Sequence, residues 1–235
     1  MKELLFILAD LWMIFACYYF GWLFIRRYDN WLLGLEYLVV GTSGTNFLLW
    51  SLSSASEDNP MYKLAYFFDA FSRSVGITII LVLGLMKVTH RYRPSLAVDL
   101  GVFGLATAAG LYLRQFHGQD LNANPTAFNV ALFYVVMNLL TAVFLAYFVK
   151  RLWDAGARGH AIWTALVSMA ATTVAITYDF FPWPFDDAYR TMFYTFALAT
   201  WGTQAFVFYR AYRALEARNR VSDASRVPMK PIAVS

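Results

Sequence analysis

The sequence predicts an all-α integral membrane protein, a seven-helix transmembrane bundle with its N-terminus outside and its C-terminus in the cytoplasm. Three observations predict this fold. First, 60% of the 235 residues are hydrophobic and 14% are charged, whereas average soluble domains have about 45–50% apolar and about 25% charged residues. Second, the apolar residues form long continuous runs. Third, basic residues gather in alternate connections between these runs. This composition excludes a soluble domain, a disordered chain and a nucleic-acid-binding module.

The apolar runs define seven expected spans, because a spanning helix needs about 20 mainly apolar residues. The runs are too long for barrel strands, and the backbone in lipid must satisfy its own hydrogen bonds, so each run is expected to be a helix. One transmembrane domain is expected over 1–217, followed by a short flexible cytoplasmic tail over 218–235. The spans are expected at about 4–25, 31–53, 61–87, 96–115, 127–149, 161–181 and 189–212.

Lysine and arginine counts give the orientation of these spans. The first, third and fifth connections and the C-terminal segment carry 14 basic residues, and the opposite side carries only Lys2, Lys63, Arg114 and Arg190. Cytoplasmic segments are enriched in Lys and Arg, so the N-terminus is expected outside and the C-terminus inside. An odd number of spans agrees with this result. The expected location is the plasma (inner) membrane, as a multi-pass protein.

An internal repeat is a further hypothesis. The segments 20–29 and 144–154 both run from an aromatic-rich helix end through a basic pair and an aromatic residue to an aspartate. Spans one to three and five to seven are therefore interpreted as candidate parallel repeats in a 3+1+3 arrangement. Shared interfacial composition is the alternative explanation. Span four, with Gly101, Gly104 and Gly110, would be a connector that packs closely on its neighbours.

The 3+1+3 layout with an outer N-terminus is similar to that of the sugar-transporter and PQ-loop class. No span contains the Pro-Gln pair of that class, so no family is assigned. Retinal chemistry is excluded because span seven has no lysine. The segment 41–44 carries a G-x-S-G string, but no span contains a histidine to act as a protease base. With Cys17 as the sole cysteine and three histidines between the spans, no cofactor, metal site or catalytic residue is predicted.

Charged residues inside the spans are the strongest functional candidates. Each costs about 2.5–3.5 kcal/mol on insertion scales. Asp69 and Arg73 are four residues apart, so they share a helix face and can form an ion pair. The pair either belongs to a substrate site or gate, or locks the packing of the helices. The full set within the spans is Asp10, Glu36, Asp69, Arg73, Asp99 and Asp179.

Polar stripes on several spans extend this set. Asn46 and Asn138 are expected to line a wet cavity, or else to join neighbouring helices by hydrogen bonds. In the predicted solute or ion path, Asp69, Arg73 and Asp179 form the external part. Asn46 and Asn138 lie deeper, Glu36 lies near the inner gate, and Asp10 lies in the outer half.

We therefore predict a membrane transporter or channel for a small polar or charged solute, with ion or proton coupling left open. The alternative is a seven-span sensor or partner-binding subunit without transport or catalytic activity. An intramembrane enzyme is the least favoured class, because no nucleophile–base pair occurs. The expected partners are the lipid bilayer and a small solute. A second copy or another membrane protein remains open as a partner, and no nucleic acid is expected.

Overall fold

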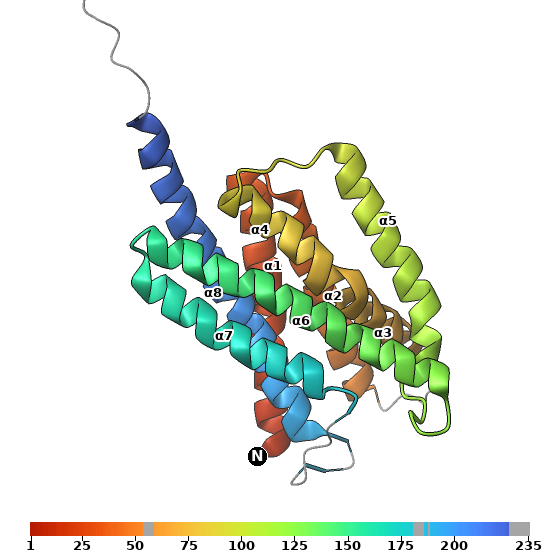
Figure 1. Ribbon diagram of the computed structural model, residues 1–235. Helices are drawn as coiled ribbons and strands as arrows, with labels where there is room; N and C mark the ends of the chain where they lie inside the picture. The colour runs from red at the N-terminus through yellow and green to blue at the C-terminus, as the bar shows by residue number, and fades with distance from the viewer. Residues whose placement is uncertain (54–58, 181–185, 188, 226–235) are drawn as a thin grey trace, which may run out of the picture.

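A computed structural model describes residues 1–53, 59–180, 186–187 and 189–225. Within these ranges all regular structure is helical. Consecutive long helices run in alternating directions through one bundle (Figure 1). The elements are α1 (Lys2–Tyr28), α2 (Trp31–Leu52), α3 (Pro60–Phe71), the π segment (Ser72–Ile80), α4 (Leu81–Thr89), α5 (Leu96–Leu113), a short 3₁₀ turn (Arg114–Phe116), α6 (Pro125–Asp154), α7 (Arg158–Thr177) and α8 (Thr191–Ala224).

Six helical stretches in the described residues are long and apolar enough to cross a membrane. They match the first six predicted spans, with α3, the π segment and α4 forming one continuous stretch. The fold is thus a helical bundle with the character of a multi-pass membrane protein. Helix α8 lies where the seventh span was predicted but is not one of the six, because threonines, Gly202 and Gln204 interrupt its apolar residues.

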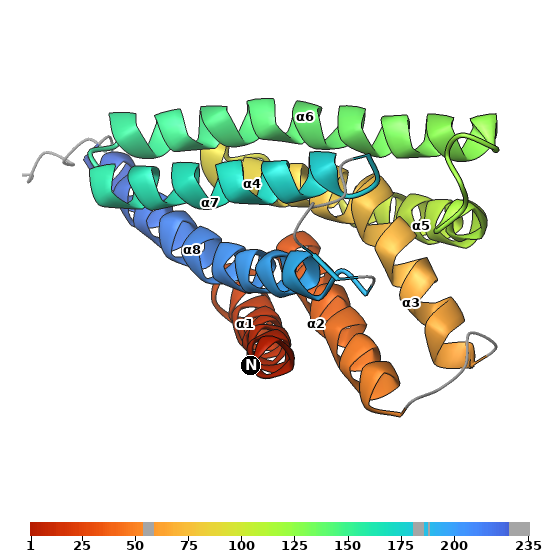
Figure 2. The same cartoon turned by 90° about the horizontal axis from the view of Figure 1, so that it is seen from below.

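The third stretch, 60–89, occupies the centre of the bundle. It is the most buried of the six, with 61% of its most apolar window inside the protein. Its π segment contacts α2, α5 and α6. Helix α1 packs along both α2 and α8, while α6 and α7 form a hairpin beside α8 (Figure 2). The polar face of this central helix is therefore shielded from lipid by its neighbours.

The prediction of one regular α-helix over 61–87 is wrong in its middle, where residues 72–80 form a π-helix. A π-helix has wider turns, with hydrogen bonds from i to i+5, and it is frequent at functional sites. The hydroxyls of Ser74 and Thr78 donate to the carbonyls of Ala70 and Ser74, at 2.6 and 2.9 Å. Hydropathy does not detect this change of geometry, because it leaves the apolar length unaltered.

Side-chain caps fix where several helices begin. The Asn30 carboxamide oxygen accepts from the backbone N–H of Leu33 at 3.2 Å and starts α2. Asn59 and Asn124 cap α3 and α6 in the same manner, and each is followed by a proline in the first helical turn. Proline is favoured there because its missing N–H would have no helical partner. The predicted starts are therefore correct to within a few residues.

Two expectations about the periphery need correction. Helix α5 is not closely packed along its whole length: an added Cβ at Gly101 or Gly104 would meet nothing within 4 Å. Gly110 alone of the three glycines is in tight contact, against the ring of Phe67 and the Cβ of Phe71. Gly101 and Gly104 therefore lie on a face of α5 that none of the described helices contacts closely.

The predicted tail also begins too early, because α8 continues to Ala224. Residues 218–224 are helical and fastened to the bundle. The Asn219 amide donates to the carbonyl of Val88 at 2.8 Å, and Arg91 pairs with Asp223. Arg220 adds an ion pair with Glu216 one turn back, at 3.0 Å. Residues 226–235 lie outside the described ranges.

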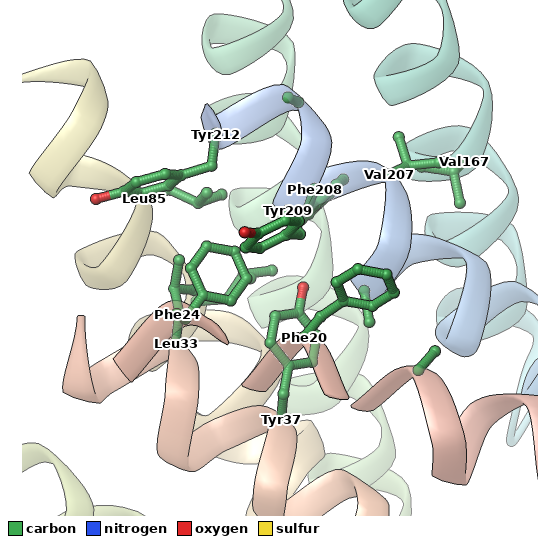
Figure 3. Close-up of a cluster of buried hydrophobic side chains, with 14 of the residues drawn as sticks. Phe20, Phe24, Leu33, Tyr37, Leu85, Val167, Val207, Phe208, Tyr209 and Tyr212 are labelled. Atoms are coloured by element: carbon green, nitrogen blue, oxygen red, sulfur yellow. The ribbon is translucent and has the colours of Figure 1, made fainter. Parts of the chain in front are cut away.

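An aromatic group closes one end of the bundle, the end where α1 and α4 finish and α2 begins. Figure 3 shows Phe24 of α1 among Tyr37 of α2 and Tyr209 and Tyr212 of α8. The Phe24 ring is fully buried, with ring centroids 5.8, 5.3 and 5.3 Å from these three tyrosines. We call Phe24, Leu33, Leu85, Tyr209 and Tyr212 the inner cluster. This is the end that the basic-residue count predicts to be cytoplasmic.

Candidate functional site

The site is built around the guanidinium of Arg73, at the start of the π segment. Its side chain is 6% exposed and donates to both Asp69 and Asp179. The Asp69 contact is the predicted i,i+4 pair, at 3.3 Å. The carboxylate of Asp179, just after α7, accepts hydrogen bonds from both terminal nitrogens of the guanidinium, and one of these bonds measures 3.3 Å. Two-point binding of this kind fixes both side chains more firmly than a single contact.

His117 belongs to the same site as Asp69, Arg73 and Asp179, and sequence reasoning missed it. Its Nδ1 lies 3.0 Å from Oδ2 of Asp69, and its ring lies 4.0 Å from that of Tyr66. It sits in the connection after α5, outside every predicted span, so it was not considered with the intramembrane charges. The available signal was that the predicted topology puts His117 and Asp69 on the same side of the membrane. We call Asp69, Arg73, His117 and Asp179 the Arg73 cluster.

Two tyrosine rings enclose the guanidinium of the Arg73 cluster. Tyr134 of α6 and Tyr178 each place a ring centroid 4.2 Å from the guanidinium carbon of Arg73. Such cation–π contacts stabilise a desolvated cation. One arginine faces two aspartates, so the cluster carries one excess negative charge when His117 is neutral. When His117 is protonated, the four charges balance.

The Arg73 cluster lies between two cavities. The outer cavity has a volume of about 690 Å³ and is lined by α1, α2, α3, the π segment and α8. The side cavity, of about 240 Å³, lies toward α6 and the connection after α5. Both cavities are lined by Arg73, His117, Tyr178 and Tyr194. These four side chains therefore form the partition between the two spaces.

Aromatic side chains form a large part of the walls of the outer cavity. They include Phe47 and Trp50 of α2, Tyr62 and Tyr66 of α3, and Trp201 of α8. The Trp50 indole nitrogen is buried and has no hydrogen-bond partner. A pocket of this size, apolar with a few polar groups converging at its floor, is typical of a small-molecule site.

The remaining predicted path residues do not join the Arg73 cluster. The Asn46 amide donates to the carbonyl of Met61 at 2.9 Å, which ties α2 to α3. The Asn138 amide donates to Tyr134 of its own helix at 2.9 Å. Neither lines either cavity. Asp10 and Glu36 are buried elsewhere, and none of their carboxylate oxygens has a hydrogen-bond partner.

Acidic residues fasten the start of α8 beside the side cavity. Asp187 accepts from the backbone N–H and the hydroxyl of Thr191, both at 3.0 Å. The donated backbone N–H holds the pKa of Asp187 below its ordinary value of 3.8. Asp186 accepts from the next two backbone N–H groups, at 2.9 and 2.8 Å. Arg190 adopts a left-handed conformation (φ 56°) and donates to the Tyr178 carbonyl at 2.8 Å.

No protein-family model matches this chain, and no curated protein or solved structure is significantly similar to it.

Proposed function

We propose that this protein is a carrier for a small polar or charged solute, held here with its binding cavity open toward the outer side. The observation that supports it is the position of the Arg73 cluster, at the floor of one cavity and the wall of another. Beyond it, toward the other end of the bundle, the inner cluster is packed without exposure of Phe24, Leu33 or Leu85. An open outer half and a closed inner half are what alternating access requires of one of its states.

The proposal includes α8 as the seventh span, the outer N-terminus and residence in the plasma (inner) membrane. The 34 residues of α8 extend about 51 Å at 1.5 Å per residue, well beyond a hydrocarbon core of about 30 Å. Its many buried residues against α1 and α7 explain how a less apolar helix is tolerated. The 3+1+3 repeat remains part of this proposal.

The Arg73 cluster is proposed as the gate between the two cavities. Its bonds join three separate parts of the chain: the central helix, the connection after α5 and the end of α7. A solute carboxylate, phosphate or hydroxyl that replaces Asp179 on the guanidinium would release the end of α7. A solute ammonium would compete for the aspartates instead. In either case, the bound solute replaces one member of the Arg73–Asp179 or Arg73–Asp69 ion pair, and this alters the contacts between the two cavities.

Flux from reconstituted vesicles tests the carrier. Vesicles are loaded with a defined mixture of amino acids, amines, sugars and organic acids, and loss of each compound is followed by mass spectrometry. We expect selective loss of one chemical class relative to protein-free vesicles, and loss of this flux in the Asp69→Asn/Arg73→Gln double variant. Lys150→Gln, which alters an exposed pair with Asp154, is the matched control.

Equal flux from the wild type and the double variant would overturn the carrier proposal. The alternative class, a sensor or partner-binding subunit, predicts no flux and a stable complex with another membrane protein. The exposed Arg213, Arg218 and Arg220 of α8 are the contact that this alternative favours. Co-purification of a partner that depends on these arginines, together with absent flux, would establish the alternative.

A further inference from the structure

Glu36 is a buried acid that the Arg73 cluster does not use. It lies on α2 with 1% of its surface exposed, and neither carboxylate oxygen has a hydrogen-bond partner. Among the described residues, no lysine, arginine or histidine forms an ion pair with it. An ionised carboxylate without a partner is strongly unfavourable in such surroundings. The side chain therefore requires a small cation to neutralise it.

Gly76 of the π segment provides the space for this carboxyl group. A Cβ added at Gly76 would lie 2.5 Å from Oε1 and 2.8 Å from Oε2 of Glu36. Any side chain at position 76 would therefore displace the carboxyl group. The absence of a side chain lets Glu36 lie directly against the backbone of the wide helical turn. The site thus rests on two helices, and both of them line the outer cavity.

The outer cavity comes within one helical turn of Glu36 on both helices. Tyr37 and Val40 flank it on α2, and Ser72, Arg73 and Ile77 flank Gly76 on the π segment; all five line the cavity. On the opposite side, the route toward the cytoplasmic end is closed. Leu32, Leu33 and Ile80 are each at most 2% exposed. Glu36 is 1% exposed and does not itself line the cavity, so a cation would reach it past the five cavity-lining neighbours, and the inner side is packed.

The groups around Glu36 bring no positive charge to it. From α1 its electrostatic neighbour is Cys17, and on α2 it is Tyr37. The π segment presents Gly76, and the nearby Arg73 is already engaged by Asp69 and Asp179. On α4, Lys87 donates to the carbonyl of Asp29, between α1 and α2, and forms no ion pair with Glu36. Within the described ranges no set of three or more His, Cys, Asp or Glu side chains could hold a metal ion with Glu36. A proton needs only one carboxylate oxygen, so it is the cation that fits this site best.

We propose that Glu36 is a proton-binding site loaded from the outer cavity. In this step one proton leaves a hydronium ion in the cavity and bonds to a carboxylate oxygen, which yields a neutral carboxylic acid and water. The coupling role rests on the proposed carrier function: the loaded acid is neutral, so the bundle can change the side to which this fixed site opens without burying an unpaired charge. The coupled ion would then be the proton.

Infrared difference spectroscopy of the protein in bilayers tests the site without any solute, because the proton itself is the probe. We expect a protonated-carboxyl band that responds to the pH of the outer solution and disappears in Glu36→Gln. Glu36→Asp should retain a shifted band, and Gly76→Ala should shift it as well. Asp99→Asn, at a partly buried acid of α5 with one unpartnered oxygen, should leave the band unchanged. Since Asp10 is a second buried acid without a partner, the comparison is repeated in an Asp10→Asn background.

A band that survives in Glu36→Gln would overturn the proton site. The proton site would also be overturned if the wild type showed no such band and were more thermally stable in sodium than in potassium, with Glu36→Gln abolishing that difference.

The flux measurements are evaluated separately from the infrared measurements. Glu36→Gln should retain flux at equal pH across the vesicle and lose the accumulation driven by an acidic outside. Flux with no Glu36 band would leave the carrier and remove the proton site. A Glu36 band without flux in the wild type would support the proton site, overturn the carrier proposal and remove the coupling role.

Discussion

The guanidinium of Arg73 is bonded at two points to the carboxylate of Asp179, a residue 106 positions later in the chain. This contact joins the centre of the bundle to the end of α7. The sequence analysis assigned both residues to the external part of one predicted path but did not predict this ion pair.

Removal of Arg73 is expected to destabilise the protein strongly. Arg73→Gln leaves Asp179 without its cation and Asp69 with His117 alone, at side chains that are 22% and 16% exposed. Removing one partner of a buried ion pair costs about 3–5 kcal/mol. The Arg73→Gln/Asp179→Asn variant should lose less than the sum of the single changes, because it leaves one acid fewer unpaired. Thermal and denaturant unfolding in detergent measure these differences. Lys150 and Asp154 form an exposed pair, 69% and 53% exposed, that should contribute only about 0–1 kcal/mol. Equal losses at the two pairs would contradict this prediction.

Two glycine substitutions should have opposite results. A Cβ at Gly202 of α8 would lie 2.8 Å from the backbone Cα of Met13, so Gly202→Ala must push α8 away from α1. Such overpacking costs about 1–3 kcal/mol. Gly104→Ala meets nothing within 4 Å and should be neutral or stabilise α5 by up to about 1 kcal/mol. Unfolding temperatures of the two variants check this directly, and a stable Gly202→Ala protein would show that α1 and α8 are less closely packed than described.

Acid should loosen the first turn of α8. The pKa of Asp187 is lowered in the folded protein because it accepts the Thr191 backbone N–H. A group with a lowered pKa stabilises the fold above its ordinary value and loses that effect as the pH falls through the folded pKa. Hydrogen exchange at Thr191 should therefore accelerate as the pH is lowered below 3.8, after correction for the intrinsic rate. Asp187→Asn should show no such step, and Asp120→Asn, a cap in another connection, should keep it.

Thiol labelling should reveal the two faces of the carrier. Cys17 is fully buried and is the sole cysteine, so Cys17→Ala gives a clean background. In it, Ser51→Cys, at the outer cavity, should react with a membrane-impermeant reagent added outside. Leu85→Cys, in the inner cluster, should be protected from outside and should react slowly from the inner side. Arg73→Gln should accelerate the inner reaction. A Leu85→Cys site that never reacts, in any variant, would indicate a static bundle.

The sequence predicted the helical bundle and its apolar helices, because hydropathy reports directly on segments long and apolar enough to cross a membrane. Asp69 and Arg73 were paired correctly, since i,i+4 spacing is a local property. The partnership with Asp179 and His117 depends on how distant helices pack, and no local pattern carries that information. For the same reason Asn46 and Asn138 looked alike in the sequence, although one joins two helices and the other bonds within its own helix. The bare face of α5 was missed because small residues look the same whether or not a neighbour approaches.

The π segment has one consequence for the phase of the central helix. Successive residues of an α-helix are rotated by about 100° around its axis. A stretch of wider π turns has a smaller rotation per residue, so the residues after it face directions that differ from those in a regular α-helix. Residues of α4 therefore stand at angles that an ideal helix drawn from Asp69 would not give them. Gly84 contacts Leu33 on α2, and Asp69 contacts His117, with the wide turns lying between these two contacts along the helix. A deletion of one residue within 72–80 that restored regular α-helix would swing one of these faces away from its partner while leaving the hydropathy of the span unchanged.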